Sequence, residues 1–293
     1  MPYSPGEPMA ITLLLENSPL AFTFLAVLLG LLVGSFLNVV IYRLPIMLER
    51  EWRDEYAPEP EPAERFDLVM PRSRCPHCGH GITAMENVPV ISYLMLRGRC
   101  SACHAPISLR YPVVEAFTGL VSGIVAWHFS FGLPAFGALG LTWSLIALSG
   151  IDLDKQLLPD RITLPVLWLG LMLNVRGTFT DLASAVAGAA AGYLSLWLIY
   201  HLFRLVTGKE GMGYGDFKLY ALLGAWLGWQ QLPVIILMSA GVGAVVGLAL
   251  LATKRIRQGA PLPFGPFLAA AGWIALLWGH PLTTAYLSIS GVH

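Results

Sequence analysis

The chain has 293 residues, of which 56% are hydrophobic and only 12% are charged. A water-soluble domain usually carries about 25% charged residues, so most of this surface is expected to face lipid. The formal net charge is zero, which argues against a nucleic-acid partner held by attraction to phosphate.

Long stretches without charge mark the membrane helices that we predict. One crossing needs about 20 apolar residues. The stretch 116–151 is long enough for two crossings with a break at 131–134, and 219–253 for two with a break at 230–233. The fold class is therefore an all-α polytopic membrane protein. Its eight helices are expected at about 18–42, 112–130, 134–150, 162–175, 182–204, 217–229, 232–252 and 264–282. Small residues at 183–192 favour close helix packing.

The basic residues set the orientation, because they gather on the cytoplasmic side of bacterial membranes. With the N-terminus outside, the cytoplasmic loops hold 17 of the 18 lysines and arginines, and only Arg176 lies outside. Both termini are then periplasmic, in the inner membrane of a Gram-negative cell. Three regions follow: an N-terminal segment with the first helix (1–42), a cytoplasmic loop domain (43–111) and a seven-helix membrane domain (112–293).

All four cysteines lie in the loop 43–111, as Cys75-Pro-His-Cys78 and Cys100-Ser-Ala-Cys103. Two such pairs separated by 21 residues are typical of a structural zinc site. The alternatives are two disulfides or free thiols, and a reducing cytoplasm disfavours disulfides. Gly79 is expected to relieve the first turn. The neighbouring histidines are interpreted as solvated bystanders: His77, His80 and His104. The acidic stretch 49–67 either attracts a basic segment or is a solvated linker, and we favour the linker.

Two aspartates adjoin apolar helices on the predicted cytoplasmic side. Asp152 ends one apolar run, and Asp216 follows three glycines and begins another. Asp154 and Asp160 lie further into their loop and are interpreted as solvated, with Asp160 also able to cap the fourth helix. Two carboxylates in one site share a proton, activate water and polarise a peptide carbonyl without a metal. From the residues alone, a functional pair and a set of solvated loop acids both remain open.

The motifs resemble the type IV prepilin leader peptidases, which are also N-methyltransferases. The resemblance covers nearly the whole chain. It rests on Gly34-Ser-Phe-Leu-Asn38-Val-Val-Ile-Tyr-Arg43-Leu-Pro45, both cysteine pairs, Asn87-Val-Pro-Val-Ile-Ser-Tyr93, Arg97-Gly98-Arg99-Cys100, Arg110-Tyr111-Pro112-Val-Val-Glu115, Asp-x₅-Leu-Pro-Asp at 152–160, Gly-x-Gly-Asp-x-Lys at 213–218 and Pro263-Phe-Gly-Pro-Phe267.

The resemblance implies a bifunctional enzyme. It would remove the basic leader from prepilins or type II secretion pseudopilins at the cytoplasmic face, and methylate the new N-terminal residue, typically phenylalanine, with S-adenosylmethionine. Asp152 and Asp216 carry over as the catalytic pair, and Cys75, Cys78, Cys100 and Cys103 as zinc ligands. Gly98 matches a position linked to methyl transfer.

Two other classes of protein also place acids beside apolar helices. One is a proton-coupled transporter, which more often has internal repeats and acids near the bilayer midplane. The other is a non-catalytic assembly scaffold of a secretion machine, with the zinc module as its docking surface. No glycine-rich cofactor loop of the Rossmann type is recognisable, so the sequence does not place the methyl donor.

Overall fold

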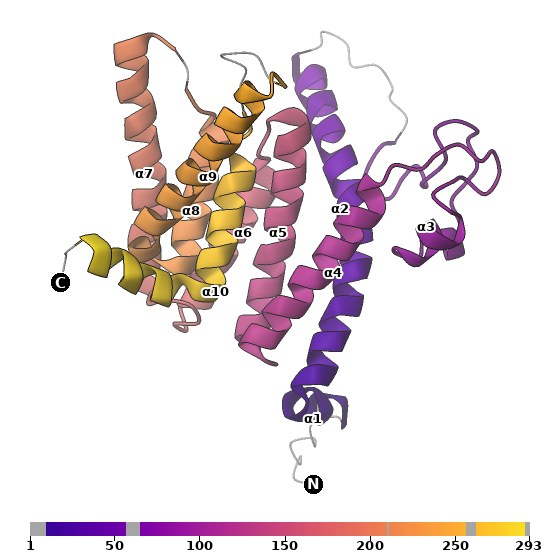
Figure 1. Ribbon diagram of the computed structural model, residues 1–293, viewed down its shortest axis with the longest axis horizontal. Helices are drawn as coiled ribbons and strands as arrows, with labels where there is room; N and C mark the ends of the chain where they lie inside the picture. The colour runs from indigo at the N-terminus through magenta and orange to yellow at the C-terminus, as the bar shows by residue number, and fades with distance from the viewer. Residues whose placement is uncertain (1–9, 57–64, 210, 256–261, 291–293) are drawn as a thin grey trace. The chain divides into compact units, whose positions relative to one another are not determined.

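The computed structural model describes residues 10–56, 65–209, 211–255 and 262–290 (Figure 1). Within these ranges the chain is helical, with two isolated β-bridges and no strand, which confirms the all-α class. The helices in chain order are α1 (Ala10–Asn17), α2 (Pro19–Tyr56), η1 (Met85–Asn87), α3 (Ile91–Met95), α4 (Arg110–Phe129), α5 (Leu133–Lys155), α6 (Asp160–Asn174), α7 (Leu182–Thr207), α8 (Tyr214–Leu227), η2 (Trp229–Gln231), α9 (Leu232–Ala252) and α10 (Gly265–Ser290).

Each of the eight predicted membrane helices has a counterpart in the structure. Five described segments are long and apolar enough to cross a membrane: Pro19–Glu55, Arg110–Phe129, Leu133–Lys155, Leu182–Thr207 and Trp229–Ala252. Helices α6 and α8 have only 15 and 14 residues, fewer than the roughly 20 of a full crossing. Helix α10 bends at Trp278, three residues before Pro281. The chain is a multi-pass membrane protein.

The first long helix extends well beyond its predicted end at residue 42. Pro45 removes one backbone hydrogen bond, yet α2 continues to Tyr56. Leu44 and Leu48 remain buried on one face beyond the apolar run. The charged residues that follow are mostly good helix formers, so the helix can leave the lipid without ending. The prediction was wrong here because it treated loss of hydrophobicity as the end of the helix. Of the acidic stretch 49–67, residues 57–64 lie outside the described part of the chain.

Backbone contacts divide the chain into two compact units, Met1–Trp143 and Ser144–His293. The predicted divisions at residues 42 and 111 stay predictions. In the first unit α2 packs along α4. Glycines bring the two backbones close: a Cβ on Gly34 would lie 2.8 Å from Glu115 Cα, and one on Gly119 would lie 3.0 Å from Leu31 Cγ. The polar segment that connects α2 and α4 holds the cysteines.

Helix α8 lies at the centre of the second unit, against α6, α7 and α10. Every residue from Leu219 to Leu227 is buried. Its C-terminal carbonyls are capped by buried Asn174, whose Nδ2 donates to Ala225 O at 2.9 Å and Trp226 O at 3.0 Å. A helix as short as α8 is stable here because protein rather than lipid surrounds it.

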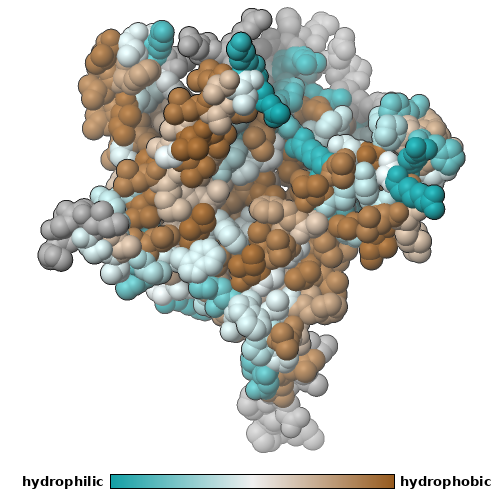
Figure 2. Space-filling view, viewed as in Figure 1, coloured by the Kyte–Doolittle hydropathy of each residue, from teal (hydrophilic) through white to brown (hydrophobic). Residues whose placement is uncertain are grey.

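Large apolar side chains are exposed on the outer surfaces of the helices. On α7 they include Leu194, Leu198, Leu202 and Leu205. Figure 2 shows such hydrophobic side chains over much of the helical surface. A soluble protein rarely exposes apolar patches of this extent, whereas lipid would cover them at no cost.

The small residues of α7 let it approach α8 closely, which confirms the packing predicted for 183–192. A Cβ on Gly192 would lie 2.7 Å from Tyr220 O. We therefore expect Gly192→Ala to lower the midpoint of thermal unfolding in detergent, at a cost of about 1–3 kcal/mol for overpacking. Gly241→Ala on α9 is the control, because its Cβ meets nothing within 4 Å. Equal midpoints for the two variants would contradict the close α7–α8 contact.

Candidate active site and cysteine cluster

Asp152 is buried near the end of α5, with 6% of its surface exposed. Its Oδ2 accepts a hydrogen bond from the backbone N–H of Gly265 at 2.9 Å. Gly265 begins α10, so this N–H is among those that a helix leaves without an internal partner. The partial positive charge of the helix N-terminus offsets part of the penalty for burying a carboxylate.

Asp216 lies in the first turn of α8 and is 8% exposed. It too is at a helix N-terminus, where negative charge is favoured. The Asp152 carboxylate acts electrostatically on Asp216, so the two groups lie close together in the second unit. The structure thus brings together the two aspartates that sequence reasoning selected.

Leu158 packs against two glycines: Gly215, which precedes Asp216, and Gly265, which donates to Asp152. A Cβ on Gly215 would lie 2.8 Å from Leu158 Cβ, and one on Gly265 would lie 3.2 Å from Leu158 Cδ2 and 2.7 Å from Asp152 Oδ2. Gly215 and Gly265 are therefore needed for close backbone approach. Neither has a positive φ, so unusual dihedrals are not their role.

The other two acids of the α5–α6 segment have different surroundings. Asp154 is exposed on α5. Asp160 is half exposed, but each of its carboxylate oxygens lies 2.7 Å from Lys218 Nζ. The interpretation of Asp160 as simply solvated is therefore wrong, and so is the cap: the N-cap of α6 is Pro159, without a side-chain hydrogen bond. The ion pair joins the start of α6 to α8, two residues after Asp216.

The four cysteine sulfurs cluster in the first unit, all within 4.8 Å of one another. Cys75 Sγ lies 3.8 Å from Cys103 Sγ, and Cys78 Sγ lies 4.0 Å from Cys100 Sγ. A tetrahedral zinc ion with Zn–S bonds of about 2.3 Å requires sulfur–sulfur separations of about 3.8 Å. All four cysteines are free thiols, which excludes the two-disulfide alternative for this structure. The donor set and its spacing fit one zinc ion.

The two Cys-x-x-Cys segments have the same backbone geometry. In the first, Cys75 N donates to His80 O and Gly79 N to Cys75 O; in the second, Cys100 N donates to Ala105 O and His104 N to Cys100 O. Gly79 has φ +72°, as its predicted role requires. His104 takes the equivalent place with φ +58°. That left-handed histidine was not predicted, because only glycine signals such a turn from sequence.

Backbone N–H groups also act on the sulfurs. Donation from Cys78 and His77 lowers the pKa of Cys75 to about 7. Donation from Cys103 and Ala102 lowers the pKa of Cys100. The close sulfurs of Cys103, Cys75 and Cys100, together with burial, instead raise the pKa of Cys78 to about 12. The thiolate is the metal-binding form of cysteine, so each segment supplies one sulfur, Cys75 or Cys100, that is predisposed to bind a metal.

Two of the three nearby histidines, His77 and His104, are exposed as predicted. His80 is not a solvated bystander. Its Nε2 lies 3.3 Å from Glu86 Oε1 and 3.3 Å from Ser101 Oγ. Glu86 also accepts hydrogen bonds from Ser101 Oγ and from Thr83, and these contacts lower its pKa to about 2. Glu86 therefore ties the two cysteine segments together.

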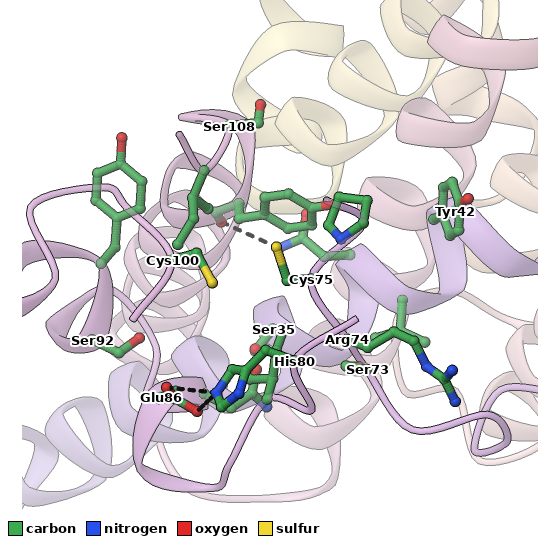
Figure 3. A pocket seen from close by; sticks show the side chains of 18 of the residues that line it. Ser35, Tyr42, Ser73, Arg74, Cys75, His80, Glu86, Ser92, Cys100 and Ser108 are labelled. Atoms are coloured by element: carbon green, nitrogen blue, oxygen red, sulfur yellow. Dashed lines mark hydrogen bonds and ion pairs between the residues drawn. The ribbon is translucent and has the colours of Figure 1, made fainter. Parts of the chain in front are cut away.

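A cavity of about 600 Å³ opens beside the cysteine cluster, within the first unit (Figure 3). Its walls come from α2, the loop and the start of α4, and include Tyr42, Tyr93, Glu86 and Glu115. Sequence reasoning did not find this cavity, because its walls come from segments up to 80 residues apart. Gly98, buried behind Tyr93, has φ +67°, and a Cβ there would lie 2.7 Å from Tyr93 Oη.

Comparisons with known proteins provide evidence on the family that is independent of the geometry. Residues 28–129 match the model of the bacterial peptidase A24 N-terminal domain, and residues 139–248 match that of the type IV leader peptidase family. The chain is 59% identical to the prepilin leader peptidase/N-methyltransferase of Stutzerimonas stutzeri and 57% identical to that of Pseudomonas aeruginosa. Each alignment covers 94% of this chain and 97% of the relative. The protein of the same name from Burkholderia pseudomallei is 50% identical, over 98% of this chain and 93% of its own. No solved structure matches the chain.

The cysteine geometry generates a metal prediction. Purified protein should contain about one zinc ion per chain, as four thiolates complete one tetrahedron. Cys75→Ser should reduce the bound zinc and destabilise the loop, whereas Ser73→Ala, a change to an exposed residue two positions away, should not. Elemental analysis with thiol titration is the measurement. Protein with no zinc and four reactive thiols would contradict the prediction.

Proposed function

This chain belongs to the type IV leader peptidase family, and we propose that it is a membrane-embedded aspartic endopeptidase that also methylates its product. Its substrates would be type IV prepilins or type II secretion pseudopilins, whose basic leader it removes. Asp152 and Asp216 would form the catalytic pair. The observation that carries this proposal is the burial of these two carboxylates, close together, at the N-terminal ends of α10 and α8.

The chemistry follows from two adjacent carboxyl groups that share one proton. The ionised group accepts a proton from water, and the water oxygen forms a bond to the scissile carbonyl carbon. The protonated group donates a hydrogen bond to the carbonyl oxygen. The carbon–nitrogen bond then breaks, and the nitrogen takes up the proton and leaves as the free amine. No metal or nucleophilic serine is required for this step.

The position of the pair suits such a substrate. Asp152 follows the apolar residues of α5, and Asp216 precedes those of α8, so both acids lie where apolar helix gives way to polar loop. A prepilin has its scissile bond at the same kind of boundary, between a basic leader and an apolar helix. The substrate's own partition between water and lipid would therefore deliver the bond to the pair.

The second activity would belong to the loop region of the first unit. S-adenosylmethionine would supply an electrophilic methyl group. The nitrogen of the freed amine would form a bond to that carbon as the carbon–sulfur bond breaks, and the methylated amine would release one proton to solvent. Zinc held by Cys75, Cys78, Cys100 and Cys103 would have a structural role, since four thiolates leave no open position. Gly98 would serve methyl transfer indirectly, by leaving room for Tyr93.

Location and orientation complete the proposal. We place the chain in the bacterial inner membrane, with residues 43–111 in the cytoplasm and both termini in the periplasm. The support is the distribution of lysine and arginine over the predicted loops. The terminal residues 1–9 and 291–293 lie outside the described part of the chain.

The orientation has a direct test. A reporter fused after residue 293 should show periplasmic activity, and one inserted within 57–64 should show cytoplasmic activity, because nearly all basic residues lie in the predicted cytoplasmic loops. Reversed signals would mean that the chain is inverted in the membrane.

The catalytic pair predicts a clear split among four conservative variants. Asp152→Asn and Asp216→Asn should each lower the rate of pseudopilin cleavage by several orders of magnitude, because each removes the base or the shared proton. Asp154→Asn is the matched control, two residues along α5 and exposed. Asp160→Asn should cost less than tenfold, because an exposed ion pair such as Asp160–Lys218 contributes only about 0–1 kcal/mol.

Cleavage should be measured on one purified pseudopilin in detergent, at matched enzyme concentration. An inactive Asp154→Asn beside an active Asp152→Asn would place the wrong aspartate of α5 in the pair. Full cleavage by all four variants would rule out the aspartic mechanism. Retained cleavage with lost transport or pilus assembly would favour a transporter or a scaffold.

A further inference from the structure

We propose that the cavity of the first unit binds S-adenosylmethionine, with the carboxylate of Glu115 facing the ligand and Tyr93 forming part of its wall. This inference rests on the proposed methyl transfer and adds the position of the donor. It begins with size and composition. Small-molecule sites are concave and have volumes of about 300–1,000 Å³, with mostly apolar walls and a few polar groups. The cavity of about 600 Å³ has this character.

The walls match the chemistry of the donor. Tyr42, Tyr93 and Tyr111 line the cavity and offer flat surfaces on which a purine ring can stack. The same faces attract cations, and the ligand carries a sulfonium and an ammonium group. The ribose hydroxyls and the ammonium are hydrogen-bond donors, which require acceptors such as carboxylates.

Glu115 is a buried carboxylate with free capacity to bind a ligand. It is on α4 in the first unit and only 8% exposed, an environment in which an unpaired acid is costly. Its Oε2 accepts the backbone N–H of Val90 at 2.8 Å, and within the described residues its Oε1 has no partner. A buried carboxylate with a single neutral donor has unused capacity for a cation or a further donor.

The Val90 contact is held by an unusual backbone. Val90 has φ +61° and ψ −48°, a region that a β-branched residue almost never adopts. Strained residues of this kind cluster at functional sites, where the surrounding structure holds a group in place. Here the strained residue points its N–H at Glu115.

Two other charged groups of the cavity already have partners, and Arg72 and Arg74 line it as well. Glu86 accepts hydrogen bonds from Thr83 and Ser101 and contacts His80, as the dashed lines to His80 in Figure 3 show. The Arg43 guanidinium donates to Asp67 O at 2.9 Å and Pro71 O at 2.6 Å. It therefore holds the segment 66–72 against α2. This leaves Glu115 as the carboxylate available to a ligand.

A substitution at Gly98 would test the same cavity in a second way, through its wall rather than its charge. It is buried behind Tyr93, and a methyl group there would meet Tyr93 Oη at 2.7 Å and Cζ at 2.9 Å. Its positive φ adds strain to any substitution. Gly98→Ala would therefore displace a wall of the cavity without changing its charge. Gly81 offers the matched control, because a Cβ there meets nothing within 4 Å.

The test is direct binding of S-adenosylmethionine to the full chain in detergent, measured by calorimetry. Glu115→Gln should weaken binding about 10- to 100-fold, as expected for loss of a charged hydrogen-bond acceptor. Gly98→Ala should also weaken binding at least tenfold. Glu16→Gln, an exposed acid of α1, and Gly81→Ala should bind like the wild type. Wild-type affinity in both Glu115→Gln and Gly98→Ala would overturn the proposed site.

A measurement on the unaltered protein avoids any effect of the substitutions on folding. Ultraviolet cross-linking of radiolabelled S-adenosylmethionine, followed by peptide mapping, should place the label within residues 35–115. Label within residues 144–293 would refute the site while leaving methyl transfer intact. A wild-type protein that neither binds the donor nor methylates a processed pilin would instead refute the proposed methyl transfer itself.

Discussion

Two carboxylates buried among apolar helices impose the main constraint on the second unit. A carboxylate in such surroundings is stable only when dipoles or donors compensate for the lost water. The chain meets this requirement with helix N-termini: Gly265, the first residue of α10, donates its N–H to Asp152, and Asp216 lies in the first turn of α8. The backbone at these helix starts can approach Leu158 and Asp152 closely only with glycine at positions 215 and 265. Leu158 and Asp152 leave no room there for a Cβ. The motifs around 152–160, 213–218 and 263–267 are thus parts of one packing arrangement.

The first unit is under a different constraint, because the described part of its polar segment lacks a hydrophobic core. The polar segment between α2 and α4 has few buried apolar side chains and cannot build a core of its own. The paired cysteine segments supply its order instead, with matching turns at Gly79 and His104 and a link through Glu86. A zinc ion held by four thiolates would complete this small structure. The cavity lies against it, so order in the metal-binding segment and order in the cavity wall depend on each other.

Much of the architecture could be predicted because lipid imposes simple rules on a sequence. Apolar runs fixed the positions of the eight helices, and the spacing of the cysteines predicted the cluster that the structure contains. The structure also places Asp152 and Asp216 near each other, as expected, while their catalytic role stays a prediction. Sequence reasoning failed where the outcome depends on contacts between distant segments. The ion pair of Asp160 and Lys218 was missed because the two residues are 58 positions apart in the sequence. The extension of α2 was missed because it depends on the burial of Leu44 and Leu48.

The central claim is that Asp152 and Asp216 act as a unit on one water molecule. A double-mutant cycle tests it most directly, using single-turnover rates of pseudopilin cleavage for Asp152→Asn, Asp216→Asn and the doubly substituted chain. Because loss of either partner removes the whole function of the pair, the double variant should be no more than about tenfold slower than the slower single variant. A double variant slowed by the product of the two single effects would show that the aspartates contribute independently, which contradicts the account.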